Sequence, residues 1–184
     1  MKNLLIVISG PSGVGKGTIA KELVKRDNTF LSISCTTRQP REGEKDGREY
    51  FFITKEQFKD KIAQGGFLEY SEHFDNYYGT PKDYVEEKLK YGDVILEIDV
   101  NGGLSVKENS QDALLIMIAP PSIEELRNRL QGRHTESDEK ITKRLERVEY
   151  ELGKKDRYDY TVINDNLEQA IERIIGIINH EKCK

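Results

Sequence analysis

The chain has 184 residues, enough for one compact domain of ordinary size and too few for two. Its 29 Lys and Arg against 33 Asp and Glu give a formal net charge of −4, which argues against general nucleic-acid binding, since that usually shows a basic domain or stripe. No apolar run approaches the roughly 20 residues of a membrane span, and Cys35 and Cys183 lie too far apart for a metal-binding motif. We therefore expect a protein of the reducing cytoplasm with no signal peptide, membrane segment or disulfide framework.

Short apolar runs alternate with helix-like patterns along most of the chain. Five runs, the second of them weaker, have the length and composition of strands covered on both faces, as in a parallel sheet: residues 4–8, 30–33, 93–99, 113–118 and 160–163. Helices are predicted between them, one beginning with a capping box at Ser122 and Glu125 and two carrying apolar stripes over 141–152 and 167–178. This alternation predicts an α/β domain.

One region breaks the alternation. Between about 38 and 80 the chain is aromatic and turn-rich, and Thr54 with Gln57 predicts the start of one short helix. We interpret this region as a small mixed β insert on the edge of the sheet. A second irregular stretch, residues 132–138, separates two predicted helices and has the composition of a loop.

A glycine-rich loop follows the first strand and precedes a helical pattern, with the sequence Gly10-Pro11-Ser12-Gly13-Val14-Gly15-Lys16-Gly17-Thr18. The glycines let backbone N–H groups converge on phosphate oxygens, and Lys16 supplies a point charge at the positive end of the helix. The hydroxyl that usually follows the lysine directly comes one residue later here, at Thr18, which leaves the contact to Mg²⁺ open. A guanine-reading Asn-Lys-x-Asp is absent from the sequence, so the loop favours a kinase over a GTPase.

The arginines are concentrated in two segments. Of eleven, three lie between 38 and 48 and six between 127 and 157. Arginine suits a bidentate grip on phosphate. Pairing on a helix surface, for example of Arg147 with Glu151 four residues on, explains the second segment in part. It does not explain Arg38 and Arg41, which flank Pro40 in a segment unsuited to a helix.

Eight motifs occur in order along the chain: Gly10-Pro-Ser-Gly-Val-Gly-Lys, Ser34-x-Thr-Thr-Arg-x-Pro-Arg-x-Gly-Glu, Asp46-Gly-x-x-Tyr50-x-Phe, Glu69-Tyr, Asn76-Tyr-Tyr-Gly-Thr80, Ile95-Leu-Glu-Ile-Asp99-x-x-Gly, Ala119-Pro-Pro-Ser and Tyr160-x-Val-Ile-Asn-Asp. Together the motifs resemble the guanylate kinase family, the ATP:GMP phosphotransferases of purine nucleotide metabolism and GMP recycling. The resemblance covers essentially the whole chain. It implies a P-loop kinase core with a five-stranded parallel sheet flanked by helices (about 1–33, 81–122 and 145–184), a GMP-binding insert (about 34–80) and a lid (about 123–144).

The resemblance also implies roles for individual residues. Contacts to guanine would come from Ser34, Glu69 and Thr80; the GMP phosphate would be held by Arg38, Arg41, Tyr50 and Tyr78, with Glu97 and Asp99 near GMP. ATP would be bound by the loop from Gly10 to Thr18, by Arg129 and, near adenine, by Asn164. The catalytic set would be Lys16, Arg38, Arg133 and Arg144. The implied cofactor is Mg²⁺, held by Thr18 and Asp99 directly or through water, and the implied partners are ATP with GMP or dGMP, without nucleic acid or membrane.

Simple chemistry supports the role of Glu69 and the need for positively charged residues at the phosphates. Guanine presents N1–H and N2–H₂ donors side by side, so the single carboxylate of Glu69 can accept from both and reject adenine. The phosphate of GMP is mostly dianionic near neutral pH, with a second pKa of about 6, and needs no general base. The reaction instead requires cations that bring two polyanions together in a site that excludes water.

Several residues have a second interpretation. Thr80 precedes a proline and fits a helix N-cap, while Asp99 at the end of a buried strand fits a cap as well as a carboxylate near Mg²⁺. Tyr50 and Tyr78 lie among aromatic residues and fit the core of the insert. For Cys35 a packing role is favoured, because nothing in the sequence lowers the pKa of its thiol.

Two alternative functions stay open from the residues alone. A scaffold of the same fold could serve as a peptide receptor, although such a module has no need of the intact loop at Gly15 and Lys16 or of the lid arginines. Another nucleoside monophosphate kinase is the second alternative, which Ser34 and Glu69 oppose for AMP. His73 and His180 have no metal partners nearby in the sequence, and we expect both on the surface.

Overall fold

The structure is a computed structural model that describes residues 2–26, 28–73, 75–131 and 138–184; the side chains of 129–131 and 138–144 are not described. Its larger sheet has five parallel strands in the order β2-β7-β1-β8-β9. These strands are β1 (Leu5–Ser9), β2 (Thr29–Leu31), β7 (Asp93–Glu97), β8 (Leu114–Ala119) and β9 (Tyr160–Ile163). The predicted five-stranded parallel sheet is confirmed, and its weakest predicted strand is the edge strand β2.

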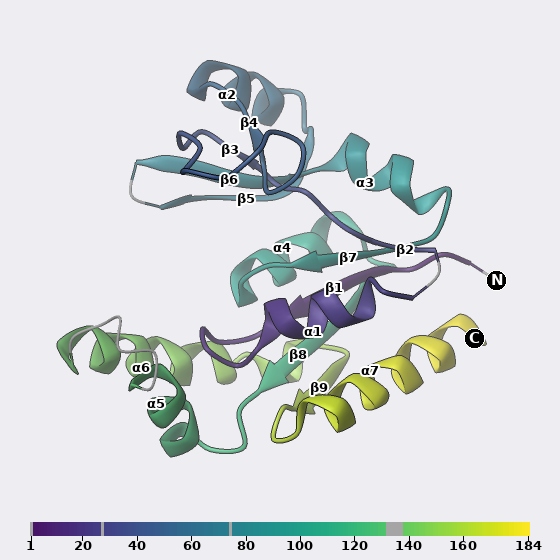
Figure 1. Cartoon of the computed structure of the whole chain (residues 1–184). Helices are drawn as coiled ribbons and strands as arrows, with labels where there is room; N and C mark the ends of the chain where they lie inside the picture. The colour runs from purple at the N-terminus through teal and green to yellow at the C-terminus, as the bar shows by residue number, and fades with distance from the viewer. Residues whose placement is uncertain (1, 27, 74, 132–137) are drawn as a thin grey trace.

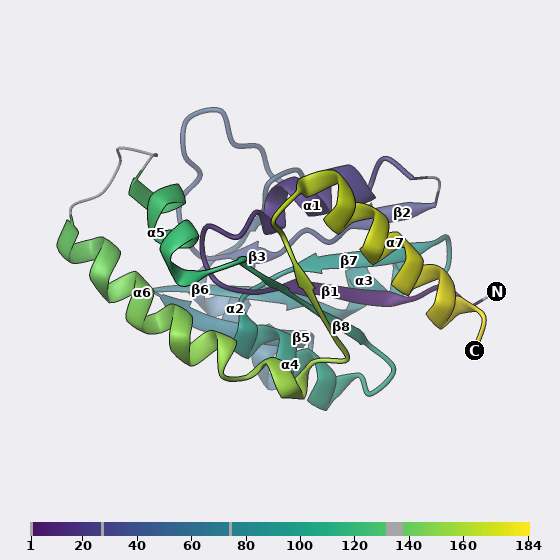
Figure 2. The ribbon, with the colours of Figure 1, turned by 90° about the horizontal axis from the view of Figure 1, so that it is seen from below.

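Helices cover both faces of this sheet (Figure 2). On one face pack α1 (Lys16–Leu23), α5 (Ile123–Gln131), α6 (Asp138–Leu152) and α7 (Leu167–Lys182), around a core that includes Ile6 and Ile8 of β1. On the other face pack α3 (Lys82–Leu89) and α4 (Val100–Asn109), around Val7 of β1 and Leu96 of β7. Because successive side chains of a strand point to opposite faces, a strand buried on both sides reads as the continuous apolar run seen at residues 4–8.

A second, smaller sheet stands beside the first (Figure 1). Its four strands run in the order β4-β3-β6-β5, with β3 and β4 parallel and the other pairs antiparallel. They are β3 (Cys35–Thr36), β4 (Phe51–Phe52), β5 (Phe67–His73) and β6 (Asn76–Pro81). The helix α2 (Lys55–Ala63) packs on this sheet through the buried Phe58. The predicted mixed β insert is confirmed, while the exact boundaries of core, insert and lid stay a prediction.

Local capping chemistry agrees with the sequence. The Thr54 hydroxyl accepts from the backbone N–H of Gln57 at 3.1 Å, and the Gln57 side chain accepts from the Thr54 N–H at 2.9 Å, which completes the predicted capping box of α2. The Ser122 hydroxyl likewise accepts from the N–H of Glu125 at 3.0 Å at the start of α5. A short 3₁₀ turn (Lys155–Arg157) precedes β9.

The carboxyl ends of the parallel strands place the polar segments together. The glycine-rich loop follows β1, Asp99 follows β7 by two residues, and Asn164 follows β9 directly. In open α/β sheets this edge is where ligands bind. In the described ranges, no helix has the length and apolar character that crossing a membrane requires.

Candidate active site

The loop between β1 and α1 is built on glycines with left-handed backbone angles. Gly10, Gly13 and Gly15 have φ of +139°, +90° and +94°. A Cβ on Gly10 would lie 2.2 Å from the carbonyl oxygen of Ile118 in β8. Only glycine therefore fits at the point where the chain leaves β1 and turns over its neighbouring strand.

Lys16 opens α1 and directs its side chain back into this loop. Its Nζ donates to the carbonyl oxygens of Gly10 at 2.7 Å and Pro11 at 3.0 Å. Burial lowers the pKa of Lys16, and the negative charges of nearby carboxylates, Glu97 foremost, oppose that shift. The ammonium group thus lies within the curve of the loop, where its charge adds to the backbone N–H groups and the helix N-terminus.

Asn164 connects the end of β9 to the loop. The residue is buried, and its Nδ2 donates to the carbonyl oxygen of Val14 at 2.8 Å. Val14 itself is fully buried in the core beneath the loop. These contacts fix the loop to the end of β9 and to the core, a role of Asn164 that the sequence did not indicate. The contact of Asn164 with adenine stays a prediction.

The unusual Gly17 lies directly against a carboxylate. A Cβ on this residue would come within 3.3 Å of both carboxylate oxygens of Glu97. The serine or threonine usual at this position would therefore press on Glu97, so the glycine leaves room for an acidic side chain close to the loop. Thr18, the next residue, is exposed.

Most of the residues expected to bind GMP line two adjoining hollows between β7 and the smaller sheet, with volumes of about 160 and 140 Å³. The predicted residues that line one or both are Ser34, Tyr50, Glu69, Tyr78, Thr80, Glu97 and Asp99. Sequence reasoning missed Ser71 and His73, which also line the larger hollow. They follow Glu69 on β5 at intervals of two, so strand periodicity could have found them. His73 is exposed, as predicted.

Glu69 and Thr80 form a buried pair across β5 and β6. The Thr80 hydroxyl donates to Oε1 of Glu69 at 2.6 Å. Thr80 is only 1% exposed and Glu69 only 8%. Burial raises the pKa of Glu69, although hydrogen bonds from Thr80 oppose the shift. The N-cap interpretation of Thr80 is wrong: α3 begins after Pro81 without a side-chain cap, and the hydroxyl is used by the carboxylate.

Arg38 is held by a carboxylate of its own loop. Its Nη1 and Nη2 donate to the two oxygens of Glu44 at 2.9 and 3.0 Å, a bidentate pair. The same carboxylate accepts from the backbone N–H of Arg41, whose side chain is exposed. The Arg38 guanidinium also lies 5.5 Å from the ring centroid of Tyr50, and Tyr50 meets Tyr78 edge to face at 6.0 Å. Packing against neighbours and lining the hollow are thus compatible roles for these tyrosines.

Asp99 joins the two halves of the site. Its Oδ1 accepts from the N–H of Gly102 at 2.8 Å and caps α4, so the capping interpretation is confirmed. Its Oδ2 lies 3.5 Å from Nη2 of Arg147 on α6. Asp99 lines the larger GMP-side hollow and also a hollow of about 280 Å³ beside the loop, together with Gly10, Ser12, Lys16, Arg147, Val148 and Glu151.

Three predicted arginines cannot be placed by their side chains. Arg133 lies outside the described residues, and Arg129 and Arg144 lie in α5 and α6 at positions whose side chains are not described. Their roles stay predictions.

Cys35 points away from the site. It lies on the opposite side of the smaller sheet, in a hollow of about 590 Å³ that Phe51, Ile53 and Tyr84 also line. Burial raises the pKa of its thiol to about 11, so the thiol stays protonated near neutral pH. The predicted packing role of Cys35 is confirmed.

An all-parallel sheet, a glycine-rich loop after its first strand and a lysine inside that loop define a P-loop nucleotide-binding fold. The comparison with known sequences narrows this class. The chain belongs to the guanylate kinase family, whose model, described as "Guanylate kinase", matches residues 2–181. Enzymes of this family phosphorylate GMP with ATP, and the chain is a phosphotransferase.

Individual relatives agree with this assignment. The guanylate kinase of Clostridium tetani is 52% identical over 184 residues, covering 100% of this chain and 88% of the relative, and that of Clostridioides difficile is 49% identical over 185 residues, covering 100% and 90%. The crystal structure of guanylate kinase from Anaplasma phagocytophilum aligns with a TM-score of 0.77 at 32% identity, covering 100% of this chain and 88% of that one. A shikimate kinase from Bacteroides thetaiotaomicron shares the fold at a TM-score of 0.53 and 14% identity, covering 96% of this chain and 98% of its own.

Proposed function

We propose that this chain transfers the γ-phosphoryl group of ATP to GMP or dGMP, giving ADP and GDP or dGDP, with GMP between β7 and the smaller sheet and ATP on the loop after β1. Asp99 lines the larger hollow on the GMP side and also the hollow beside the loop, so the two substrates meet beside this residue. Two unpaired cysteines, Cys35 and Cys183, favour a reducing cytoplasm as the place of this reaction.

The observation that carries the proposal is the buried carboxylate of Glu69. It lines the hollow on the GMP side, with one oxygen held by Thr80. A carboxylate has acceptors only, so it suits the paired N1–H and N2–H₂ donors of guanine and opposes the unprotonated N1 of adenine. A wrong base would leave the carboxylate buried without a donor, and such unpaired groups give strong discrimination.

The GMP phosphate is proposed to bind Arg38 and Arg41, with the hydroxyls of Tyr50 and Tyr78. Arg38 already presents its fork to the carboxylate of Glu44. Phosphate oxygens match the same geometry, so binding exchanges one anion for another without leaving the guanidinium unpaired.

Transfer itself is proposed to depend on position and charge. Lys16 and the backbone of its loop hold the phosphates of ATP, and Arg129, Arg133 and Arg144 add positive charge as the resemblance implies. No side chain is needed to remove a proton, because the acceptor is already mostly a dianion at neutral pH. Excluding water from the site strengthens each of these interactions.

Mg²⁺ fits the acidic end of this site. Its protein ligands in kinases are one or two carboxylates or hydroxyls, with phosphate oxygens and water completing the shell. Asp99 offers Oδ2, whose contact with Arg147 is long at 3.5 Å, and Thr18 offers an exposed hydroxyl near the loop. We propose these two as the residues that hold the ion, directly or through water. When bound, Mg²⁺ neutralises phosphate charge.

A coupled assay of ADP release tests the function. With ATP and Mg²⁺ present, we expect ADP release that depends on GMP, a much weaker response to AMP or UMP, and loss of activity when EDTA removes the metal. A peptide-binding module would show no GMP-dependent release above background, and preference for AMP or UMP would contradict the role of Glu69.

A further inference from the structure

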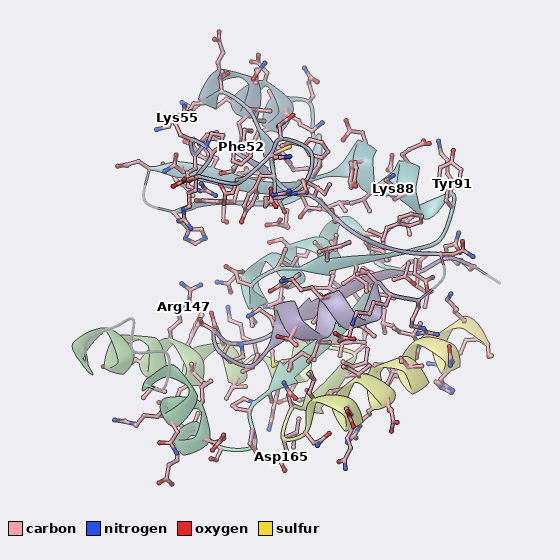
Figure 3. All side chains as sticks on the ribbon, in the orientation of Figure 1. Phe52, Lys55, Lys88, Tyr91, Arg147 and Asp165 are labelled. Carbon is pink, nitrogen blue, oxygen red and sulfur yellow. The ribbon has the colours of Figure 1, made fainter. Side chains whose placement is uncertain are left out.

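Arg147 lies in the hollow beside the phosphate loop, although it is not one of the arginines implied by the family motifs. Figure 3 shows its side chain rising from α6 on the side of the loop between β1 and α1. The same hollow is lined by Lys16, Asp99 and Glu151. The sequence predicts a helix-surface pair of Arg147 with Glu151, and the structure gives Arg147 a second partner, Asp99.

The two ends of the arginine are held unequally. Its Nε donates to Oε1 of Glu151 at 2.8 Å, and the Glu151 side chain is 7% exposed. Its Nη2 lies 3.5 Å from Oδ2 of Asp99, and the Arg147 side chain is 54% exposed. The inner contact is short and its acceptor is buried, whereas the outer contact is at the limit of hydrogen-bond length.

A helix-surface pair does not account for this arrangement. Exposed pairs four residues apart contribute little, and nothing in such a pair requires the carboxylate to be buried. A buried carboxylate needs a lasting partner, and Arg147 is the partner that the structure records for Glu151. Asp99 lies just after β7, at the N-cap of α4 and 48 residues before Arg147 in the chain, so their contact arises from the fold.

We propose that Arg147 is a nucleotide-binding residue that keeps its Nε on Glu151 and turns its Nη groups from Asp99 to phosphate oxygens of ATP. This inference rests on the proposed function of the loop as the ATP site. The exchange gives the guanidinium a stronger anion and releases Oδ2 of Asp99 for Mg²⁺. Glu151 acts as a positioning residue, since it holds the Nε of Arg147 while the Nη groups change partner.

The test compares Arg147→Ala, Arg147→Lys and Arg147→Gln with Arg157→Ala. Arg157 is a matched control, because it is 58% exposed and its recorded partner, Glu108, lies 3.8 Å away and outside this hollow. The measurements are the Kd of a non-hydrolysable ATP analogue with Mg²⁺ by calorimetry, the KM of ATP and of GMP, and the melting temperature of each full-length variant.

Loss of a charge-assisted contact to phosphate predicts that Arg147→Ala raises the Kd of the ATP analogue about tenfold. The KM of GMP should change by less than about twofold, because uniform loss of ATP binding leaves the other substrate unaffected. Lysine keeps the charge without the fork and should restore part of the affinity. Arg157→Ala should match the wild type.

A Kd for Arg147→Ala that equals that of Arg157→Ala would overturn the inference, as would equal effects on ATP and GMP. If the alanine variant melts early, the glutamine variant decides, since its amide can still donate to Glu151, whereas the charge and the Nη groups proposed to bind phosphate are lost. The two proposals fail separately. Absence of GMP-dependent ADP release by the wild type would reject the proposed function, whereas unchanged binding of the ATP analogue by Arg147→Ala and Arg147→Gln would reject this inference alone.

Discussion

Replacing Thr80 by valine removes one hydroxyl from a buried pair and keeps the shape of the side chain. In the structure that hydroxyl donates to Oε1 of Glu69 at 2.6 Å, and Thr80 is 1% exposed. Water therefore cannot easily replace the lost donor. The variant retains the carboxylate proposed to read guanine and removes the hydroxyl that holds this carboxylate in place, a hydroxyl that is itself predicted to contact guanine.

The size of the effect follows from the charge and burial of the pair. A hydrogen bond to a charged group contributes about 1.5–3 kcal/mol, and leaving its acceptor unsatisfied costs a similar amount. We expect the free energy of unfolding to fall by about 2 kcal/mol near pH 8, which for a chain of this length lowers the melting temperature by about 4–8 °C. A misplaced or protonated Glu69 should also raise the KM of GMP about tenfold and leave that of ATP nearly unchanged.

The pH dependence separates this mechanism from a simple packing defect. Burial holds the pKa of Glu69 above its ordinary value of 4.5, and loss of the Thr80 hydroxyl should raise it further. The destabilisation is complete where Glu69 is ionised in the folded wild type and is lost as the pH falls through its raised pKa, because a protonated carboxyl no longer needs the donor. Melting curves from about pH 8 towards about pH 4.5 should therefore converge for Thr80→Val and the wild type.

Thr80→Ser is the matched control, since it restores the hydroxyl without the methyl group. It should recover most of the GMP affinity and the wild-type pH profile. A difference in stability between valine and wild type that stays constant over this pH range would refute the reasoning. So would serine and valine variants with the same KM for GMP.

Three further variants test other parts of the site. Glu69→Gln should weaken the preference for GMP over AMP while the KM of ATP changes by less than about twofold, and unchanged preference would mean that the base is read elsewhere. Lys16→Ala should lower turnover by about 10²–10³ with little change in melting temperature, and near-normal turnover would contradict its role. Gly10→Ala forces a Cβ to within 2.2 Å of the Ile118 carbonyl oxygen, so it should lower the melting temperature sharply, whereas Gly176→Ala, with open space around it, should not.

The features that the sequence predicted correctly are those set by local patterns. Buried parallel strands appear as continuous apolar runs, and the phosphate loop has its own spacing of glycines and lysine. The capping box of α2 is likewise formed by two residues close in the chain, Thr54 and Gln57. For such elements the residues that determine the structure lie within a few positions of one another.

Other features depend on contacts between distant residues, and the sequence could not resolve them. Thr80 before a proline has the local signature of a helix cap, but the register of β5 and β6 sets it opposite Glu69, and the carboxylate takes the hydroxyl. The spacing of four residues predicts the pair of Arg147 with Glu151 and cannot predict Asp99, which contacts Arg147 from the N-terminus of α4. The sequence shows that Gly17 replaces the usual serine or threonine after the loop lysine. It does not show that the carboxylate of Glu97 lies against this glycine.

The distribution of charge explains how a chain of net charge −4 can hold two polyanions. Three described cations of the site already have acidic groups beside them: Arg38 is bound by Glu44, Arg147 contacts Asp99, and the negative charges of nearby carboxylates partly oppose the lowering of the Lys16 pKa by burial. The protein therefore carries no unbalanced positive patch at these positions before substrate binds. At Arg38 and Arg147 each proposed phosphate contact replaces a carboxylate by a phosphate on the same cation, so binding there requires a change of partners and not the creation of a new charged site. Net charge describes the whole surface, whereas this exchange depends on the few groups that face the loop.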